Sequence, residues 1–490
     1  MSETSGTYDV VVLGAGPCGE NLAERTSDAG LSTVIVESEL LGGECSFWAC
    51  EPSKALLRPV LARADAHRVP GFGAIAEAMD PAAVFAHRDK LAAYWHDDDQ
   101  VAWLGSVPVD LVRGHGRLDG PRQVTVRSSG GDTVRLSARY AVAVCTGTDS
   151  ALPALPGLAR VRPWTNRDAT SSDTVPGRLA VVGGGVVATE MATAWRALGS
   201  EVTMLVRGEG LLPRMEPFAG EMVADALRAS GVDVRLSTSV ASVTREGGPP
   251  AQVRTTLSDG AELATDEILF ATGRAPRTGD IGLDTVGAAP GDWLSVDETF
   301  RVRSVPEGWL YAAGDVNHRA LMTHQSKYQA RIAGAIIGAR ANGRPLDDGP
   351  WGAHAPTADS VAVPQVVVTD PEVASVGPTA REAERLGRRV DVVDYDLGRV
   401  AGAVQYADGY RGRARLLIDQ DRGTVAGATF VGPGVAELLY SATVAVTSEI
   451  PVERLWHAVP AFPTISEVWL RLLETRRDSA ATVRGAEADF

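Results

Sequence analysis

The chain has 490 residues, of which 44% are hydrophobic and 22% are charged, a composition typical of a globular protein with up to three domains. Its formal net charge of −15 argues against nucleic acids and anionic membranes as partners. No apolar run reaches the roughly 18 residues of a membrane span, and no basic segment precedes the first apolar run. We therefore expect a cytoplasmic protein.

The chain begins with a strand, a Gly-rich turn, a helix and a second strand, all within residues 8–37. This order is the βαβ unit that binds nucleotides. Gly14, Gly16 and Gly19 would let the backbone approach a pyrophosphate at the helix N-terminus. Glu37 ends the second strand, where a carboxylate can accept the ribose hydroxyls. A tight turn without a ligand is the alternative.

Two cysteines, Cys45 and Cys50, follow in the string GGECSFWACEPSK. Their spacing is longer than that of a CxxC metal pair, and no second ligand pair accompanies them. We expect a disulfide that exchanges electrons with a nearby cofactor, and two buried structural cysteines are the alternative. A helix beginning near Cys50, beside Lys54, should lower the pKa of a thiol there. The two remaining cysteines, Cys18 and Cys145, are expected to be structural.

A second βαβ unit lies in the middle of the chain, with Gly183, Gly185 and Ala188 in its turn. An acid at the end of its second strand would pair with a free ribose 2′-hydroxyl. Arg207 and Arg214 follow that strand instead, and arginine favours a 2′-phosphate. The sequence thus predicts NADPH over NADH. A solvated surface pair is the alternative reading of the two arginines.

The stretch from Gly42 to Lys54 resembles a specific hallmark, GG-x-C-x4-C-x-P-[SK]-K, of the FAD-dependent pyridine nucleotide–disulfide oxidoreductases. This family includes dihydrolipoamide dehydrogenase, glutathione reductase and mercuric reductase. The likeness extends from Tyr8 to about Leu473. Other strings that resemble family motifs, in the family's order, are GHGR around Gly116, CTGT, ATGRAP, YAAGDV at 311–316, LMTH at 321–324 and VVVTDPEVASVG at 366–377.

The resemblance implies an α/β fold with two Rossmann-like doubly wound nucleotide-binding domains and a C-terminal α+β dimerisation domain. It also implies a homodimer. The expected boundaries are residues 1–155 and 276–350 for the FAD-binding domain, 156–275 for the NAD(P)H-binding domain, 355–476 for the dimerisation domain and 477–490 for a frayed tail.

Roles follow from the resemblance by position. Cys50 would be the charge-transfer thiol beside the flavin, and Cys45 the interchange thiol that faces the substrate. Lys54 and Glu190 would form an ion pair at the flavin's reactive ring nitrogen. The implied FAD-binding residues are Gly14, Gly16, Gly19, Glu37, Gly43, Lys54, Gly116, Thr146, Gly147, Asp315, Met322, Thr323 and His324. The implied NAD(P)H-binding residues are Gly183, Gly185, Ala188, Arg207, Arg214 and Gly273. No metal site is expected.

One departure from the family concerns the C-terminal acid/base. The family has His-Pro-Thr-x-x-Glu, supplied by the partner subunit, where this chain has Phe462 through Glu467. The glutamate is present and the base is absent. A placed general base typically contributes ~10²–10⁴-fold, so ordinary dithiol turnover should be impaired. His457 could substitute through a loop shift, although a surface histidine is the simpler reading.

A second departure surrounds the cysteines. Phe47 and Trp48 would either narrow the disulfide face or pack inward. Glu44 and Glu51 place two acids where the family has neutral residues. Their carboxylates would raise thiol pKa values and repel anionic substrates such as glutathione.

Three functions are consistent with these features. The first is an NAD(P)H-dependent oxidoreductase that passes electrons through FAD and the Cys45–Cys50 disulfide to a small-molecule acceptor of the disulfide or dithiol type. The second is an NAD(P)H-dependent reductase of a quinone, a dye or a metal ion. Mercuric reductase resembles this chain in having a non-histidine aromatic at the position of Phe462, but this chain lacks that enzyme's C-terminal cysteine pair. The third is a non-catalytic flavin redox sensor.

Overall fold

The structure is a computed structural model that describes residues 3–73, 75, 78–247 and 251–488. The chain divides into two compact units, each assembled from three separate stretches of sequence. The first unit comprises Met1–Pro52, Arg88–Ala151 and Gly273–Ser360. The second comprises Ser53–His87, Leu152–Thr272 and Val361–Phe490.

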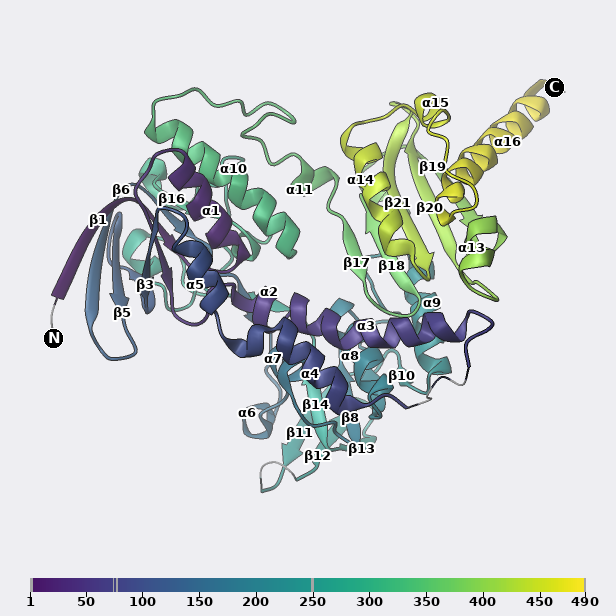
Figure 1. Ribbon diagram of the computed structural model, residues 1–490, viewed down its shortest axis with the longest axis horizontal. Coiled ribbons are helices and arrows are strands. Elements are labelled where there is room, and N and C mark those ends of the chain that lie inside the picture. Colours follow the sequence, from purple (N-terminus) through teal and green to yellow (C-terminus); the bar gives the residue numbers. More distant parts are fainter. Residues whose placement is uncertain (1–2, 74, 76–77, 248–250, 489–490) are drawn as a thin grey trace. The chain divides into compact units, whose positions relative to one another are not determined.

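A seven-stranded sheet forms the centre of the first unit. Its parallel part is built from β1, β2, β3, β6 and β16, and β4 and β5 extend it in antiparallel fashion from β6. Helices α1 (Pro17–Asp28) and α10 (Thr323–Ala341) lie side by side (Figure 1). The strands are β1 (Glu3–Leu13), β2 (Thr33–Glu37), β3 (Val109–Arg113), β4 (His115–Leu118), β5 (Gln123–Arg127), β6 (Thr133–Val144) and β16 (Leu310–Ala312).

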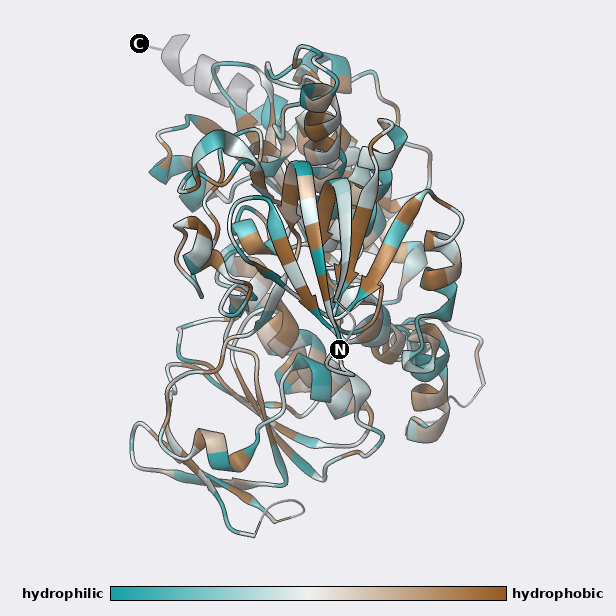
Figure 2. Ribbon diagram, turned by 90° about the vertical axis from the view of Figure 1, so that its left-hand side faces the viewer, coloured by the Kyte–Doolittle hydropathy of each residue, from teal (hydrophilic) through white to brown (hydrophobic). Residues whose placement is uncertain are grey.

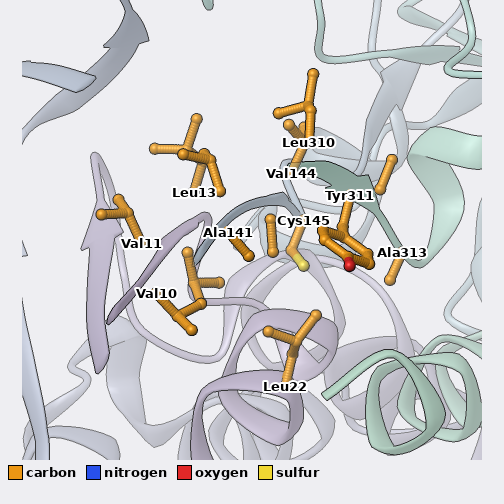
Figure 3. Close-up of a cluster of buried hydrophobic side chains, with 14 of the residues drawn as sticks. Val10, Val11, Leu13, Leu22, Ala141, Val144, Cys145, Leu310, Tyr311 and Ala313 are labelled. Atoms are coloured by element: carbon orange, nitrogen blue, oxygen red, sulfur yellow. The ribbon is translucent and has the colours of Figure 1, made fainter. Parts of the chain in front are cut away.

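The core of this unit lies between the parallel strands and α1. Val10, Val11 and Val144 are fully buried, as expected for a strand covered on both faces. Figure 2 shows hydrophobic residues along these strands. In Figure 3, Leu22 of α1 lies opposite the strands, and the sulfur of Cys145 lies within the same cluster.

The second unit contains three sheets. One is a parallel sheet in the order β10-β9-β8-β14, one is an antiparallel sheet of β11, β12 and β13, and one is an antiparallel sheet in the order β17-β18-β21-β20-β19. The strands are β8 (Arg178–Val182), β9 (Glu201–Leu205), β10 (Asp233–Arg235), β11 (Val240–Arg245), β12 (Val253–Leu257), β13 (Glu262–Thr265), β14 (Glu267–Phe270), β17 (Gln365–Val367), β18 (Glu372–Val376), β19 (Val390–Asp396), β20 (Arg413–Asp419) and β21 (Thr424–Gly432).

The remaining longer elements are helical. Those that bear on the site are α2 (Gly43–Phe47), α3 (Cys50–His67), α4 (Pro81–Leu91), α8 (Val186–Ala197), α9 (Pro217–Ala229), α14 (Leu439–Thr447) and α16 (Val468–Ala488). No helix among the residues that the structure describes has both the length and the apolar character needed to cross a membrane.

The predicted α/β fold class is confirmed, including both βαβ units. Helix α4 ends at Leu91, and Ala93–Trp95 form a short turn in which all three residues have positive φ. Helix α16 continues to Ala488, and the frayed tail expected at 477–490 stays a prediction. The division into three domains stays a prediction.

Candidate active site

The first Gly-rich turn has the geometry of a phosphate cradle. Gly14 has φ +98°, and a Cβ there would lie 2.5 Å from the carbonyl oxygen of Cys145. A Cβ on Gly19 would lie 1.8 Å from the carbonyl oxygen of Gly14, so only glycine lets α1 start so close to β1. Gly16 is the N-cap of α1, and a helix N-terminus is the kind of site that stabilises the charge of a pyrophosphate.

Glu37 lies at the end of β2, as predicted. Its Oε2 accepts a 2.7 Å hydrogen bond from the backbone N–H of Ala15, and its Oε1 accepts one of 2.7 Å from the N–H of Glu39. The carboxylate is thus held at the Gly-rich turn. This arrangement fits the adenosine half of FAD.

Asp315, the predicted flavin-side carboxylate, is joined to the first Thr-Gly turn. Thr148 Oγ1 donates to Asp315 Oδ2 at 2.9 Å. Arg274 lies at the second Thr-Gly turn, and its guanidinium donates to Thr148 Oγ1 at 2.9 Å and to the Thr148 carbonyl oxygen at 2.6 Å. Burial raises the pKa of Asp315, and the Thr148 hydrogen bond and Arg274 oppose that rise. The donors around this carboxylate fit a flavin-binding loop.

Cys45 and Cys50 are adjacent, as their spacing predicted. Cys45 lies in α2, and Cys50 is the first residue of α3. Both are present as thiols that are hydrogen-bonded to each other. The Cys50 Sγ is also 3.2 Å from the Oγ1 of Thr323, the first residue of α10. The pair and Thr323 form one cluster within the first unit.

The pKa of Cys45 is raised well above that of an ordinary thiol. The hydrogen bond with Cys50 is the largest cause, followed by burial, and Glu51 adds to the effect. Because the thiolate is the reactive form, Cys45 needs help to lose its proton at neutral pH. The predicted influence of Glu51 is therefore present.

The expected role of Glu44 is wrong in one respect. Its carboxylate is not an open negative charge at the disulfide, because Arg274 and Arg277 each approach it to 3.3 Å. Arg277 also pairs with Asp149 at 2.6 Å. The neutralised Glu44 cannot by itself repel an anionic acceptor. Of the two acids expected to disfavour glutathione, only Glu51 remains.

The two aromatic residues between the cysteines pack differently. Phe47 is completely buried, so the inward-packing reading holds for it, while Trp48 is half-buried with its ring centroid 5.7 Å from that of Phe47. The indole N–H of Trp95 donates to the Phe47 carbonyl oxygen at 3.0 Å. Trp95 belongs to the turn of three positive-φ residues. That turn therefore supports the loop between the cysteines.

Lys54 and Glu190 form the predicted ion pair, with 2.8 Å between Nζ and Oε2. The Glu190 side chain is only 4% exposed and that of Lys54 is 45% exposed. The second oxygen of Glu190 accepts the backbone N–H of Val368 at 2.9 Å. The carboxylate is thus fully engaged within the second unit.

The second Gly-rich turn matches its predicted geometry. Gly183 has φ +134°, and a Cβ there would lie 3.5 Å from that of the buried Ala188. Gly185 caps α8 and faces open space. Arg207 and Arg214, which follow β9, are both exposed. These residues fit a pyridine nucleotide, with two cations available at the end of β9.

The C-terminal departure from the family is visible in the second unit. The side chain of Phe462 is 74% exposed. Glu467 is buried, and its Oε1 accepts a 2.5 Å hydrogen bond from Arg471, while its Oε2 has no hydrogen-bond partner among the described residues. His457 is exposed. The glutamate that would orient a histidine is held by an arginine instead.

The other predicted cofactor residues are found in the first unit. Their placements are as follows: Gly43 packs on Gly16, Gly116 packs on Leu13 and Val36, Thr146 Oγ1 bonds the Arg277 carbonyl oxygen, Gly147 and Gly273 have positive φ, and Met322 and His324 lie at the start of α10.

Several residues of the site were not found from the sequence. Thr148, Arg274 and Arg277 lie beside the two Thr-Gly turns. The positive charge of the two arginines next to these turns is the signal that could have identified them. Trp95 gave no signal, because its partner is a backbone carbonyl oxygen. Arg471 lies four residues after Glu467, a spacing at which an ion pair is common in helices, and this spacing is the signal that could have identified it.

Comparison with known proteins agrees with this geometry. The family profile described as pyridine nucleotide-disulphide oxidoreductase matches residues 8–330, and the profile of its dimerisation domain matches residues 363–472. Mercuric reductase of Shigella flexneri is 30% identical to this chain over 472 residues, and the match covers 95% of this chain and 80% of that protein. Dihydrolipoyl dehydrogenase of Synechocystis sp. is 29% identical, covering 94% and 97%.

Two solved structures share the fold. LpdA from Mycobacterium tuberculosis superposes with a TM-score of 0.79 at 25% identity, covering 96% of this chain and 99% of that one. The Cu(II) complex of the HOCl-induced flavoprotein disulfide reductase RclA from Escherichia coli has a TM-score of 0.80 at 22% identity, with coverage of 96% and 99%. The chain therefore belongs to the pyridine nucleotide-disulphide oxidoreductase family and is an FAD-dependent NAD(P)H oxidoreductase.

Proposed function

We propose that the protein passes electrons from NADPH through FAD to Cys45 and Cys50, and from this dithiol to a thiophilic metal ion such as Hg(II) or Cu(II). The observation that carries the proposal is a dithiol in a chain with a phenylalanine at the position of the family's histidine. Phe462 takes the histidine's position, and Arg471 holds Glu467. An acceptor that needs no proton from the enzyme suits such a site.

FAD, when bound, accepts a hydride from the nicotinamide and makes the electron pair available to the disulfide. The chain's own residues then have distinct tasks. Asp315 and the Gly-rich turn hold the cofactor, and Thr323 orients Cys50 through a 3.2 Å contact. Lys54 supplies a cation whose position is fixed by Glu190.

The raised pKa of Cys45 favours a thiophilic metal ion over an organic disulfide as the acceptor. An organic disulfide is attacked by a thiolate, so exchange is slow where the thiol keeps its proton and no base removes it. A thiophilic cation displaces that proton as it binds. Two thiolates and one Hg(II) then give one disulfide and Hg(0), or two Cu(II) are reduced to two Cu(I). Either reaction transfers two electrons.

The names of two relatives agree with this choice, since one is a mercuric reductase and one structural neighbour is a Cu(II) complex. Among the described residues no cluster of three or more His, Cys, Asp or Glu could hold a resident metal ion. The metal is therefore proposed as a substrate that meets the two cysteines alone.

Reduction of a disulfide is the second candidate. It is favoured by Arg274 and Arg277, which neutralise Glu44 and remove one obstacle to an anionic disulfide. In that reaction water would carry the proton that the family's histidine carries.

We also infer a homodimer and a preference for NADPH. The dimerisation domain and the exposed Phe462 support the first, because a 74% exposed phenyl ring is costly in water. The exposed Arg207 and Arg214 support the second.

The decisive experiment measures NADPH oxidation by the FAD-loaded enzyme with Hg(II), Cu(II), lipoamide, glutathione disulfide and a quinone. We expect metal-ion turnover to exceed disulfide turnover and to be lost in Cys45→Ser and Cys50→Ser. Quinone turnover that survives both substitutions would assign direct electron transfer from the flavin and overturn the dithiol pathway. Absence of turnover with every acceptor would favour a redox sensor.

A further inference from the structure

A second pair of cysteines lies in the FAD-binding unit, apart from Cys45 and Cys50. Cys18 is the second residue of α1, inside the first Gly-rich turn, and Cys145 directly follows β6 and precedes the Thr146-Gly147 turn. Their sulfur atoms are 3.7 Å apart although the residues are 127 positions apart in sequence. The sequence alone gave both cysteines only a structural role.

The surroundings of the pair are mostly apolar. Cys18 is 7% exposed and Cys145 is 5% exposed, and both belong to the core cluster of the first unit. Figure 3 shows the sulfur of Cys145 near Tyr311 of β16, the strand that leads to Asp315. The Cys18 thiol donates a hydrogen bond to the Cys145 sulfur. A cysteine that only fills space in the core does not need a second thiol beside it.

Both sulfurs adjoin backbone that binds the cofactor. Gly14, at the start of the Gly-rich turn, lies against the Cys145 carbonyl group. Gly314, which precedes Asp315, lies against the Cys18 side chain, since a Cβ there would be 3.0 Å from its Sγ. The pair therefore lies beneath three FAD-binding segments, namely the Gly-rich turn, the first Thr-Gly turn and the Asp315 loop.

We propose that Cys18 and Cys145 are a second dithiol–disulfide couple, whose oxidised form ties the Gly-rich turn to the end of β6 and retains FAD. A disulfide needs a sulfur–sulfur distance of about 2.05 Å, so each sulfur moves by less than one ångström from its present position. With a peroxide as oxidant, one thiol becomes a sulfenic acid with loss of one water. The second thiol then displaces a second water, giving one disulfide for each peroxide consumed.

The couple is expected to be slow. The hydrogen bond with Cys145 and burial raise the pKa of Cys18 well above that of an ordinary thiol. Because thiolates react faster than thiols, the pair stays reduced in brief contact with peroxide and closes only on sustained exposure. Turnover at Cys45 and Cys50 does not require it.

The test uses the FAD-loaded Cys45→Ser/Cys50→Ser variant, in which Cys18 and Cys145 are the only remaining cysteines. We expect sustained peroxide to abolish both reactive thiols, to remove two hydrogen atoms from the intact mass, and to yield a Cys18–Cys145 cross-linked peptide. FAD release should then slow by about threefold or more, because the binding segments are tied in their bound arrangement. Adding dithiothreitol should restore both the thiols and the faster release.

The matched control is the same variant with Cys145→Ser, which cannot cross-link and should release FAD at one rate before and after peroxide. Should the double variant fold poorly, a non-reduced digest of the peroxide-treated wild-type protein locates the same cross-link. The proposal is overturned if the thiols survive, if they oxidise to sulfinic acids without a cross-link, or if the cross-link forms and the FAD release rate does not change.

Discussion

The carboxylate of Glu190 is shared between Lys54 Nζ at 2.8 Å and the backbone N–H of Val368 at 2.9 Å. This is an ion pair in which the anion is buried and the cation is not. Removing the Glu190 side chain should therefore cost more stability than removing only its charge. Glu190→Ala should lower the free energy of unfolding by about 1–3 kcal/mol, since the part-buried N–H of Val368 loses its acceptor.

Glu190→Gln is the matched variant, because it retains an acceptor for Val368 and removes the charge beside Lys54. We expect it to lower the unfolding free energy by less than about 1 kcal/mol, while it slows reduction of FAD by NADPH in stopped-flow absorbance. Equal stability losses in the two variants, measured by urea denaturation, would show that the ion pair and not the hydrogen bond stabilises this segment.

Phe462 offers a direct test of the missing base. Phe462→His should raise lipoamide or other disulfide turnover by at least roughly tenfold, and it should leave metal-ion turnover within about twofold, since that reaction needs no base. Phe462→Tyr is the control for side-chain size. An unchanged disulfide rate in the histidine variant would mean that proton transfer does not limit this enzyme, and that Phe462 serves another purpose.

Glu44 should influence which acceptors bind. Glu44→Gln removes the anion between Arg274 and Arg277 and leaves two cations near Cys45. The KM for glutathione disulfide should fall by about threefold or more, and the free energy of unfolding should fall by about 1–2 kcal/mol. Glu39→Gln is a suitable control, because Glu39 is more exposed and contacts only Arg277 of the two, at 3.5 Å. The same KM in both variants would contradict the proposed role of Glu44.

The fold and the cofactor turns were predictable because they rest on local rules. Gly14 and Gly183 stand where a Cβ would strike a carbonyl oxygen, so their places in the sequence report the backbone directly. The capture of Glu44 by Arg274 joins residues 230 positions apart, and the contact of Cys18 with Cys145 spans 127. No local pattern encodes such contacts. The pairing of Glu467 with Arg471 is different, because the two residues are only four positions apart and such a pair is a local pattern.

Glu20 should make stability depend on pH. Burial raises the pKa of its carboxyl from 4.5 to about 7, with Lys327 opposing and Glu37 adding to the rise. Between these values the folded chain holds a proton that the unfolded chain has lost, so the unfolding free energy falls as pH rises through that window. Glu20→Gln should remove that fall and be more stable than wild type by about 1–3 kcal/mol at a pH near 8, with no gain near pH 4. Urea denaturation of both proteins across this range is the measurement, and parallel pH profiles would refute the shift.

The proposed preference for NADPH depends on two arginines that pair with no acid among the ion pairs described. Arg207 lies two residues after β9 ends at Leu205, and Arg214 lies seven residues further along the chain. A ribose phosphate is expected to bind near the end of this strand. Arg207→Ala/Arg214→Ala should raise the KM for NADPH by about 10–100-fold, as expected for the loss of two charge-assisted hydrogen bonds. The KM for NADH should change little, because NADH lacks the 2′-phosphate.

A control separates this effect from a general loss of positive charge. Arg228 lies on α9 and is paired with Asp225 at 3.3 Å, so Arg228→Ala removes a cation from the same unit away from β9. That variant should retain the wild-type KM for both nucleotides. Steady-state kinetics at two ionic strengths completes the comparison, since a specific phosphate contact survives moderate salt better than long-range attraction does. If the double variant loses NADH and NADPH affinity equally, the arginines bind the pyrophosphate or stabilise the turn, and the selectivity assigned to them is wrong.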